Sequence, residues 1–188
     1  MRRISVGCLV TLLVVALAGP QMVSGQSVFL GAAATIPTQD FADFGDGDGA
    51  KTGFMGFGGV LFPVGTGAVS VGAEGFFGSN SHETEGDKTN LYGALALVAL
   101  TLGDEFTSIR PAFFGGLGYM TASRKSESFP GLEGSESGLA GGAGLAVGFP
   151  LGGIGGSIAG SYNFGLGDLD GITFIGISAL VQIPVGGS

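Results

Sequence analysis

Ile154-Gly-Gly-Ser-Ile-Ala-Gly-Ser-Tyr-Asn-Phe164 is the stretch of this chain that shows its structure most clearly. Ile154, Ile158, Tyr162 and Phe164 alternate with other residues, and the intervening positions of the same parity are glycines. The opposite parity holds only Gly, Ala, Ser and Asn. A period of two places alternate residues on opposite faces of a β-strand. The stretch therefore predicts a strand with one apolar face and one narrow, mildly polar face.

The same alternation recurs along the chain, clearly in seven runs and more weakly in an eighth. It predicts strands at residues 27–36, 53–62, 68–78, 91–102, 108–120, 139–149, 154–164 and 172–183. The predicted connections alternate in length: the short ones are 63–67, 103–106 and 150–153, and the long ones are 37–52, 79–90, 121–138 and 165–171. An even number of strands joined in this way is typical of an up-and-down barrel of an outer membrane.

The N-terminus has the pattern of a cleaved export signal. Its first residues are basic, an apolar run covers residues 8–18, and small residues stand at 23–25. This pattern predicts a signal peptide at residues 1–25 and a barrel domain at residues 26–188. The apolar run is too short for a membrane-spanning helix, which needs about 20 apolar residues. If the chain enters a membrane, it must do so as a closed barrel.

Charged residues are few, at 12% of the chain, and they are unevenly placed. Outside the predicted signal, five Lys and Arg residues stand against 15 Asp and Glu residues, which excludes a basic patch for nucleic acid. Twelve of the acidic residues fall in the predicted long loops and two in a short turn, and only Glu74 falls in a predicted strand. Charge on a lipid-facing strand costs a few kcal/mol, so this distribution favours a membrane barrel over a soluble β-sandwich.

Glu74 and Arg110 are charged residues that the alternation places on the inner face of predicted strands. Their strands flank the fourth one, so the two side chains are expected to be next-nearest neighbours across a narrow interior. An enclosed guanidinium favours a bidentate carboxylate, which predicts an ion pair across the lumen. We interpret the pair as a plug that fixes the register and closes the bore, with a gate for ions as the alternative.

Asp43, Asp46 and Asp48 make the first long loop acidic. They allow weak contacts with divalent cations that are shared with lipopolysaccharide phosphates. An EF-hand loop needs Glu at its twelfth position, and Phe57 stands there when the count begins at Asp46. A solvated loop is therefore the favoured reading, with no resident metal and no cofactor.

His82 is the single histidine, within Ser79-Asn-Ser-His-Glu83. A Ser, a His and an acidic residue in one loop invite comparison with barrel enzymes that trim lipid A. Catalysis needs these groups fixed in mutual contact, and a flexible loop of small polar residues does not fix them. The sequence therefore predicts a protein that is not an enzyme.

Glycines on the inner face are expected to make room for larger inner side chains, because the interior of an eight-stranded barrel just holds them. The larger inner residues are Phe29, Phe57, Phe76, Phe114 and Arg110. The glycines are Gly31, Gly72, Gly116, Gly118, Gly142, Gly144, Gly148 and Gly155. A bore filled in this way is expected to pass little or nothing.

Together these features resemble the small eight-stranded outer-membrane barrels, the superfamily that includes the membrane domain of OmpA and OmpX. The resemblance covers about residues 26–185 and rests on the signal, the strand number, the loop asymmetry and the inner pair Glu74 and Arg110. The stretches Ser70-Val-Gly-Ala-Glu-Gly-Phe-Phe-Gly-Ser-Asn-Ser-His82 and Gly86-Asp-Lys-Thr-Asn-Leu-Tyr-Gly93 are similar to those of small members of this group.

The resemblance implies an all-β fold, an eight-stranded antiparallel up-and-down transmembrane β-barrel, located in the cell outer membrane. It implies outer-membrane lipids, lipopolysaccharide and the barrel-assembly machinery as partners, no nucleic acid, and a monomer. The implied role is non-enzymatic, in envelope structure or in surface interactions through acidic extracellular loops. The alternative is a narrow channel for ions or small solutes, gated by the pair of Glu74 and Arg110.

Overall fold

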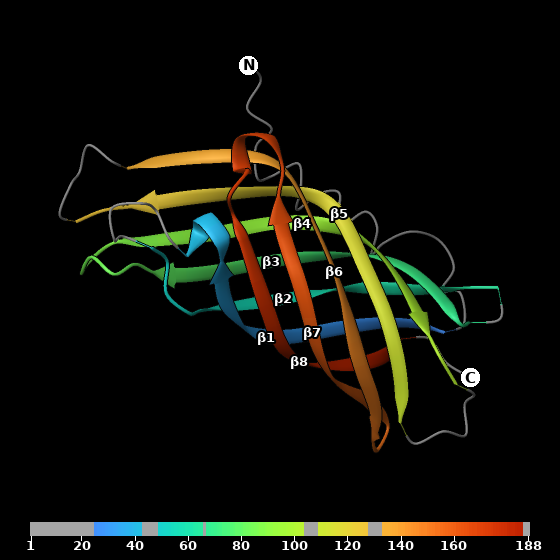
Figure 1. Cartoon of the computed structure of the whole chain (residues 1–188). Coiled ribbons are helices and arrows are strands. Elements are labelled where there is room, and N and C mark those ends of the chain that lie inside the picture. The colour runs from blue at the N-terminus through green and yellow to red at the C-terminus, as the bar shows by residue number, and fades with distance from the viewer. Residues whose placement is uncertain (1–24, 43–48, 66, 104–108, 128–132, 186–188) are drawn as a thin grey trace.

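The computed structural model describes residues 25–42, 49–65, 67–103, 109–127 and 133–185, which form a closed antiparallel barrel (Figure 1). Its strands are β1 (Gln26–Thr38), β2 (Gly53–Val64), β3 (Val69–Ser81), β4 (Lys88–Thr101), β5 (Arg110–Lys125), β6 (Gly134–Leu151), β7 (Ile154–Gly165) and β8 (Thr173–Val185). Two short 3-10 helices, η1 (Gln39–Phe41) and η3 (Gly167–Leu169), lie in the long connections. The end of the barrel that carries the long connections is called the long-loop end, and the opposite end is called the short-turn end. The eight predicted strands and the predicted up-and-down barrel are confirmed.

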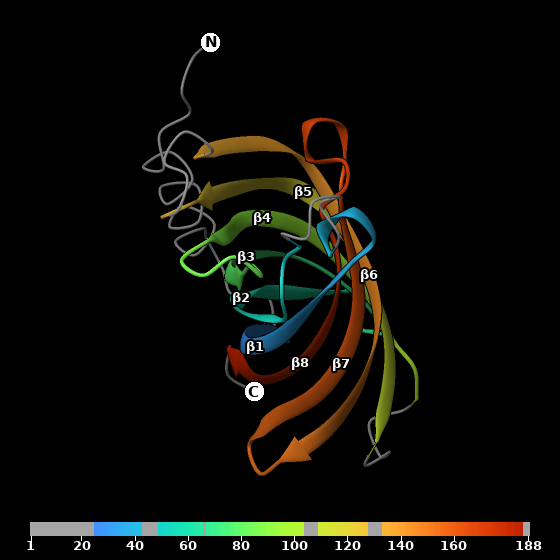
Figure 2. The same ribbon diagram turned by 60° about the vertical axis from the view of Figure 1, so that its left-hand side comes forward.

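The barrel is closed by pairing between its first and last strands, which lie side by side (Figure 2). The ladder is continuous from Gln26 opposite Val185 to Thr38 opposite Thr173. Because β1 pairs with both β2 and β8, no strand of the barrel is left as an edge. Closure therefore pairs backbone groups that an open sheet would present to its surroundings.

Apolar side chains cover the outer face of the barrel. Leu30 and Leu117 are 67% and 65% exposed, and Phe54, Phe77 and Tyr119 are each more than half exposed near the long-loop end. An exposed apolar surface of this extent is unusual for a soluble monomer. Among the described residues, no helix is long and apolar enough to cross a membrane.

The strands at the long-loop end are longer than the hydrophobic alternation predicted. β5 continues to Lys125 and β6 begins at Gly134, so most of the predicted loop 121–138 is strand (Figure 1). The added residues are mainly small or polar and lack the alternation, but they still pair across the ladder, for example Ser123 with Ser135. Glu136 consequently lies in a strand, which corrects the prediction that Glu74 is the single acidic residue in one.

Inner glycines lie against aromatic rings, as predicted, at two well-defined positions. At Gly31 an added Cβ would contact the ring of Phe57 and would lie 2.8 Å from the Cβ of Leu180. At Gly144 an added Cβ would lie 2.5 Å from the ring of Phe114. The interior therefore accommodates these phenylalanines because the positions opposite them carry no side chain.

We expect Gly31→Ala to destabilise the barrel by about 1–3 kcal/mol, because the added methyl group overpacks the interior. Gly56→Ala is the matched control, since a Cβ at Gly56 meets nothing within 4 Å. The measurement is the urea midpoint of unfolding in detergent, followed by gel mobility of the unheated protein. Equal midpoints for the two variants would contradict this account of the packing.

Candidate functional site

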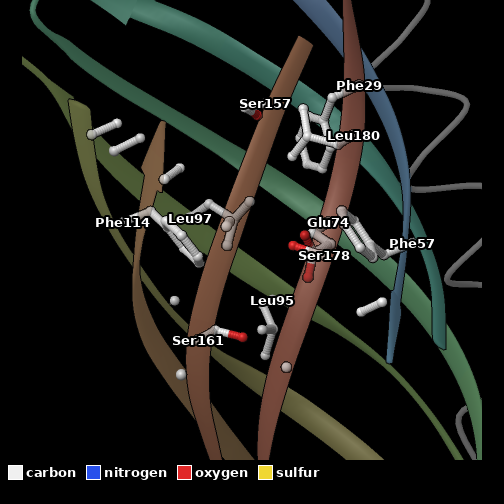
Figure 3. Close-up of a pocket in the computed structure, with 18 of the residues that line it drawn as sticks. Phe29, Phe57, Glu74, Leu95, Leu97, Phe114, Ser157, Ser161, Ser178 and Leu180 are labelled. Carbon is white, nitrogen blue, oxygen red and sulfur yellow. The ribbon is translucent and has the colours of Figure 1, made fainter. Parts of the chain in front are cut away.

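The middle of the barrel encloses a cavity of about 180 Å³, which is the candidate functional site. Its lining comes from all eight strands and is mainly apolar (Figure 3). The larger apolar residues include Phe29, Phe57, Leu95, Leu97, Phe114 and Leu180. Three serines, Ser157, Ser161 and Ser178, also line the cavity. Among the described lining residues, Glu74 alone carries an ionisable acid or base.

Glu74 projects from β3 into this cavity, in agreement with the inner position that its parity predicted (Figure 3). Its side chain is partly buried, and it also lines a smaller adjoining cavity of about 30 Å³. Within the part of the chain that the structure describes, the Glu74 carboxylate has no hydrogen-bond or ion-pair partner. It is therefore an acidic group whose lone pairs face a mainly apolar space.

Arg110 begins β5 and lines a different cavity, of about 590 Å³, at the short-turn end. Glu74 is opposite Leu95, and Leu95 is opposite Gly118. From Gly118 to Arg110 the chain runs eight residues along β5, which corresponds to roughly 26 Å of strand. The structure therefore does not bring the two predicted partners together. Alternation placed both side chains inside the barrel, but it carries no information on their height along the barrel axis.

The central cavity and the cavity at the short-turn end are contiguous. They share the lining residues Thr101, Ala112, Ala146, Ser157 and Gln182. The lumen therefore continues from Glu74 toward the end of the barrel where Arg110 lies.

At the long-loop end, an apolar cluster packs against inner residues of the strands. Phe41 in η1 and Leu169 in η3 turn inward and are 1% and 0% exposed. They belong to one buried cluster with inner residues of the strands, which include Met55, Leu91, Met120 and Phe174. Sequence reasoning missed Phe41 and Leu169, because both lie in connections where strand alternation has ended. The one available sign of an inward side chain was a large apolar residue that stands among acidic residues and glycines in each connection.

A buried polar network holds the first long connection onto the barrel. Asn80, which is fully buried, donates from Nδ2 to the hydroxyl of Thr35 at 2.9 Å and to the carbonyl oxygen of Lys51 at 2.8 Å. The Thr35 hydroxyl donates back to Asn80 Oδ1 at 3.2 Å. The network joins β1, β3 and the residues that precede β2, so it fixes the end of the first connection.

His82 is part of the ordered end of the barrel, and the expected flexible loop around it is wrong. β3 continues to Ser81, and His82 itself forms a β-bridge with Ala50. The imidazole Nε2 lies 2.7 Å from the hydroxyl of Thr89, and the residue is 3% exposed. Nearby in sequence, the buried Asp87 accepts from Arg124 Nη2 at 3.5 Å. These polar groups contribute to the packing of the barrel end.

The predicted cation contacts at Asp43, Asp46 and Asp48 lie outside the described residues, as does the predicted signal peptide apart from its last residue. Across the described ranges, no group of three or more His, Cys, Asp or Glu side chains could hold a metal ion.

The chain matches no protein-family model and no curated protein. Among solved structures it is similar to Neisserial surface protein A, with a TM-score of 0.68 and 13% identity over 88% of this chain and 100% of that one. The fold is that of the small outer-membrane barrels. The N-terminal β-barrel domain of Pseudomonas aeruginosa OprF also has it (TM-score 0.52, 13% identity, 84% of this chain and 97% of that one).

The outer membrane enzyme PagL shares this outer-membrane barrel fold, with a TM-score of 0.50 and 15% identity over 85% of this chain and 99% of that one. Identities this low establish likeness of fold alone. Since an enzyme is among the similar structures, the outer-membrane barrel fold is compatible with either an enzymatic or a non-enzymatic role.

We expect Asn80→Ala to loosen the first connection, because it leaves the buried Thr35 hydroxyl without its partner at a cost of about 1–3 kcal/mol. The expected result is faster cleavage by trypsin after Lys51, which is exposed, together with a lower unfolding midpoint. Asn90→Ala is the matched control, as the structure gives the Asn90 side chain no hydrogen bond within the described residues. Unchanged cleavage in Asn80→Ala would show that the network does not hold this connection.

Proposed function

We propose that this protein is a non-enzymatic barrel of the outer membrane, with a lumen through which solutes do not pass and acidic loops that face outward. Its role is in envelope structure or surface contacts. The observation that carries the proposal is the apolar cluster around Phe41 and Leu169, which packs against inner residues of the strands at the long-loop end. A small solute that entered from the other end would meet this cluster before it could leave.

Membrane placement is supported by the outer face of the barrel. Its exposed side chains are apolar through the middle of every strand, while the described acidic residues other than Glu74 lie toward the long-loop end. This matches the physical demand of a bilayer, in which an apolar band faces the hydrocarbon and charges stay near the interfaces. Export by the signal peptide and insertion by the barrel-assembly machinery belong to the same proposal. A closed sheet without edges also fits a monomer.

The alternative function, a channel gated by an ion pair of Glu74 and Arg110, is not favoured, because the strand register holds these two residues at different heights along the barrel axis.

The non-enzymatic role is supported by the environment of His82, the single histidine. Its imidazole is buried and contacts the Thr89 hydroxyl, which leaves little access for a substrate.

We expect the protein to be recovered in outer-membrane fractions, to migrate differently on a detergent gel before and after boiling, and to be electrically silent in planar bilayers. A change in gel mobility on boiling indicates a closed barrel, and the absence of ion conductance indicates a lumen that does not pass ions. An eight-stranded barrel of known conductance serves as the positive control. Recovery in soluble fractions would refute the membrane location, and discrete conductance steps would refute the closed lumen.

Contact with lipopolysaccharide is supported by a pair of lysines on the outer face. Lys88 of β4 and Lys125 of β5 are directly opposite in the ladder, and both are exposed. Tyr92 and Tyr119 lie on the same face, closer to the middle of the barrel. Like charges in this position destabilise a sheet, and a phosphate between them relieves the repulsion. Lipopolysaccharide supplies phosphates at this height if the tyrosines mark the membrane interface.

We expect the double variant Lys88→Gln/Lys125→Gln to retain less lipopolysaccharide after purification in mild detergent, by about tenfold, because each exposed ion pair contributes up to about 1 kcal/mol. Lys51→Gln is the control, because it removes one exposed positive charge elsewhere at the same end. The measurement is bound lipopolysaccharide per protein by mass spectrometry. Equal retention in the wild type and the double variant would remove this contact from the proposal.

A further inference from the structure

We propose that the central cavity around Glu74 is a binding site for a small organic cation with an apolar body, such as an aromatic or short-chain amine. This inference goes beyond the structural role proposed above, because it assigns a ligand class to the interior of the barrel. It rests on three observations: a carboxylate without a partner among the described residues, aromatic and aliphatic walls of suitable size, and a wider neighbouring cavity that shares part of the lining.

The carboxylate of Glu74 provides the attraction for a cation. It lies inside the barrel in a mainly apolar cavity, with no hydrogen-bond or ion-pair partner within the described residues. Taking a charged group out of water costs free energy unless an opposite charge or hydrogen bonds compensate. Arg110, which the sequence offered as that compensation, lines the other cavity. A ligand ammonium at Glu74 would supply the missing partner.

The walls of the cavity fit the apolar part of such a ligand. Phe29 and Phe57 lie with their ring centroids 6.4 Å apart and tilted by 53°, and Phe114 lines the cavity from β5 (Figure 3). Aromatic faces attract cations and also pack against apolar groups. A dry apolar cavity of about 150 Å³ binds benzene, so the cavity of about 180 Å³ has room for one ring and a short amine.

Hydrogen-bond acceptors complete the site. The hydroxyl oxygens of Ser157, Ser161 and Ser178 line the same cavity as Glu74 (Figure 3). An ammonium group has three donors and no acceptor, so it can bond the carboxylate and a hydroxyl oxygen together. A carboxylate ligand would be repelled by the ionised form of Glu74, and a neutral ligand would lack the charge pair that an ammonium forms with it. The cavity therefore favours a cation over an anion.

We expect the ligand to enter from the short-turn end. The central cavity is contiguous with the wider one of about 590 Å³, whereas the cluster around Phe41 occupies the opposite end. Arg110 lines the wider cavity and does not line the central one around Glu74.

The test is binding of benzylamine to the full barrel in detergent micelles, measured by ligand-observed NMR. Benzyl alcohol and benzoate serve as neutral and anionic ligands of the same size. We expect saturable binding of benzylamine, weaker binding of benzyl alcohol and none of benzoate. We expect Glu74→Gln to weaken benzylamine binding about tenfold or more, the loss of one hydrogen bond to a charged group.

Glu136→Gln is the matched control, because Glu136 is exposed and its change alters the net charge equally. A second variant, Ser178→Leu, keeps Glu74 but fills the cavity with a larger side chain. We expect it to abolish benzylamine binding as well. It replaces Glu74→Gln as the test if that variant does not fold. Gel mobility before and after boiling verifies the fold of each variant. Equal benzylamine signals from all variants, or no saturable signal from the wild type, would overturn the proposal.

Discussion

Pairing between β1 and β8 is the interaction on which the rest of the structure depends. It closes a sheet that would otherwise have two unpaired edges, and it runs along the whole of β1. Closure divides every strand into an outer and an inner set of side chains, which face different surroundings. The apolar outer face, the narrow lumen and the cavity at Glu74 all follow from that division.

Inside the closed sheet, space is the controlling constraint. Glycines at positions such as Gly31 and Gly144 leave room for Phe57 and Phe114, so the middle of the lumen is walled by rings. Where strands give way to connections, Phe41 and Leu169 fold inward and occupy the space that strand residues leave. The lumen is consequently lined mainly by apolar residues, with the buried cluster of Phe41 and Leu169 toward one end and a wider cavity at the other.

The sequence predicted the strands and the barrel because alternation records which face each side chain occupies. It could not predict the height of a side chain along the axis, which depends on the stagger between strands, so the pair of Glu74 and Arg110 was wrong although both inner positions were right. It also ended β5 too early and began β6 too late, because residues such as Ser123 and Ser135 pair through their backbones without an apolar face. Phe41 and Leu169 lay in connections, where no periodicity marks an inward side chain.

The pairing of the first strand with the last also sets the order in which the protein can fold. β1 is the first strand to leave the ribosome, and its second partner, β8, is the last. Until β8 pairs with it, β1 is an open edge of the sheet, and the apolar outer side chains are already present. Contacts between such distant segments form slowly, and exposed edges promote aggregation in the meantime. The chain must therefore be kept from other chains until its final strand is available.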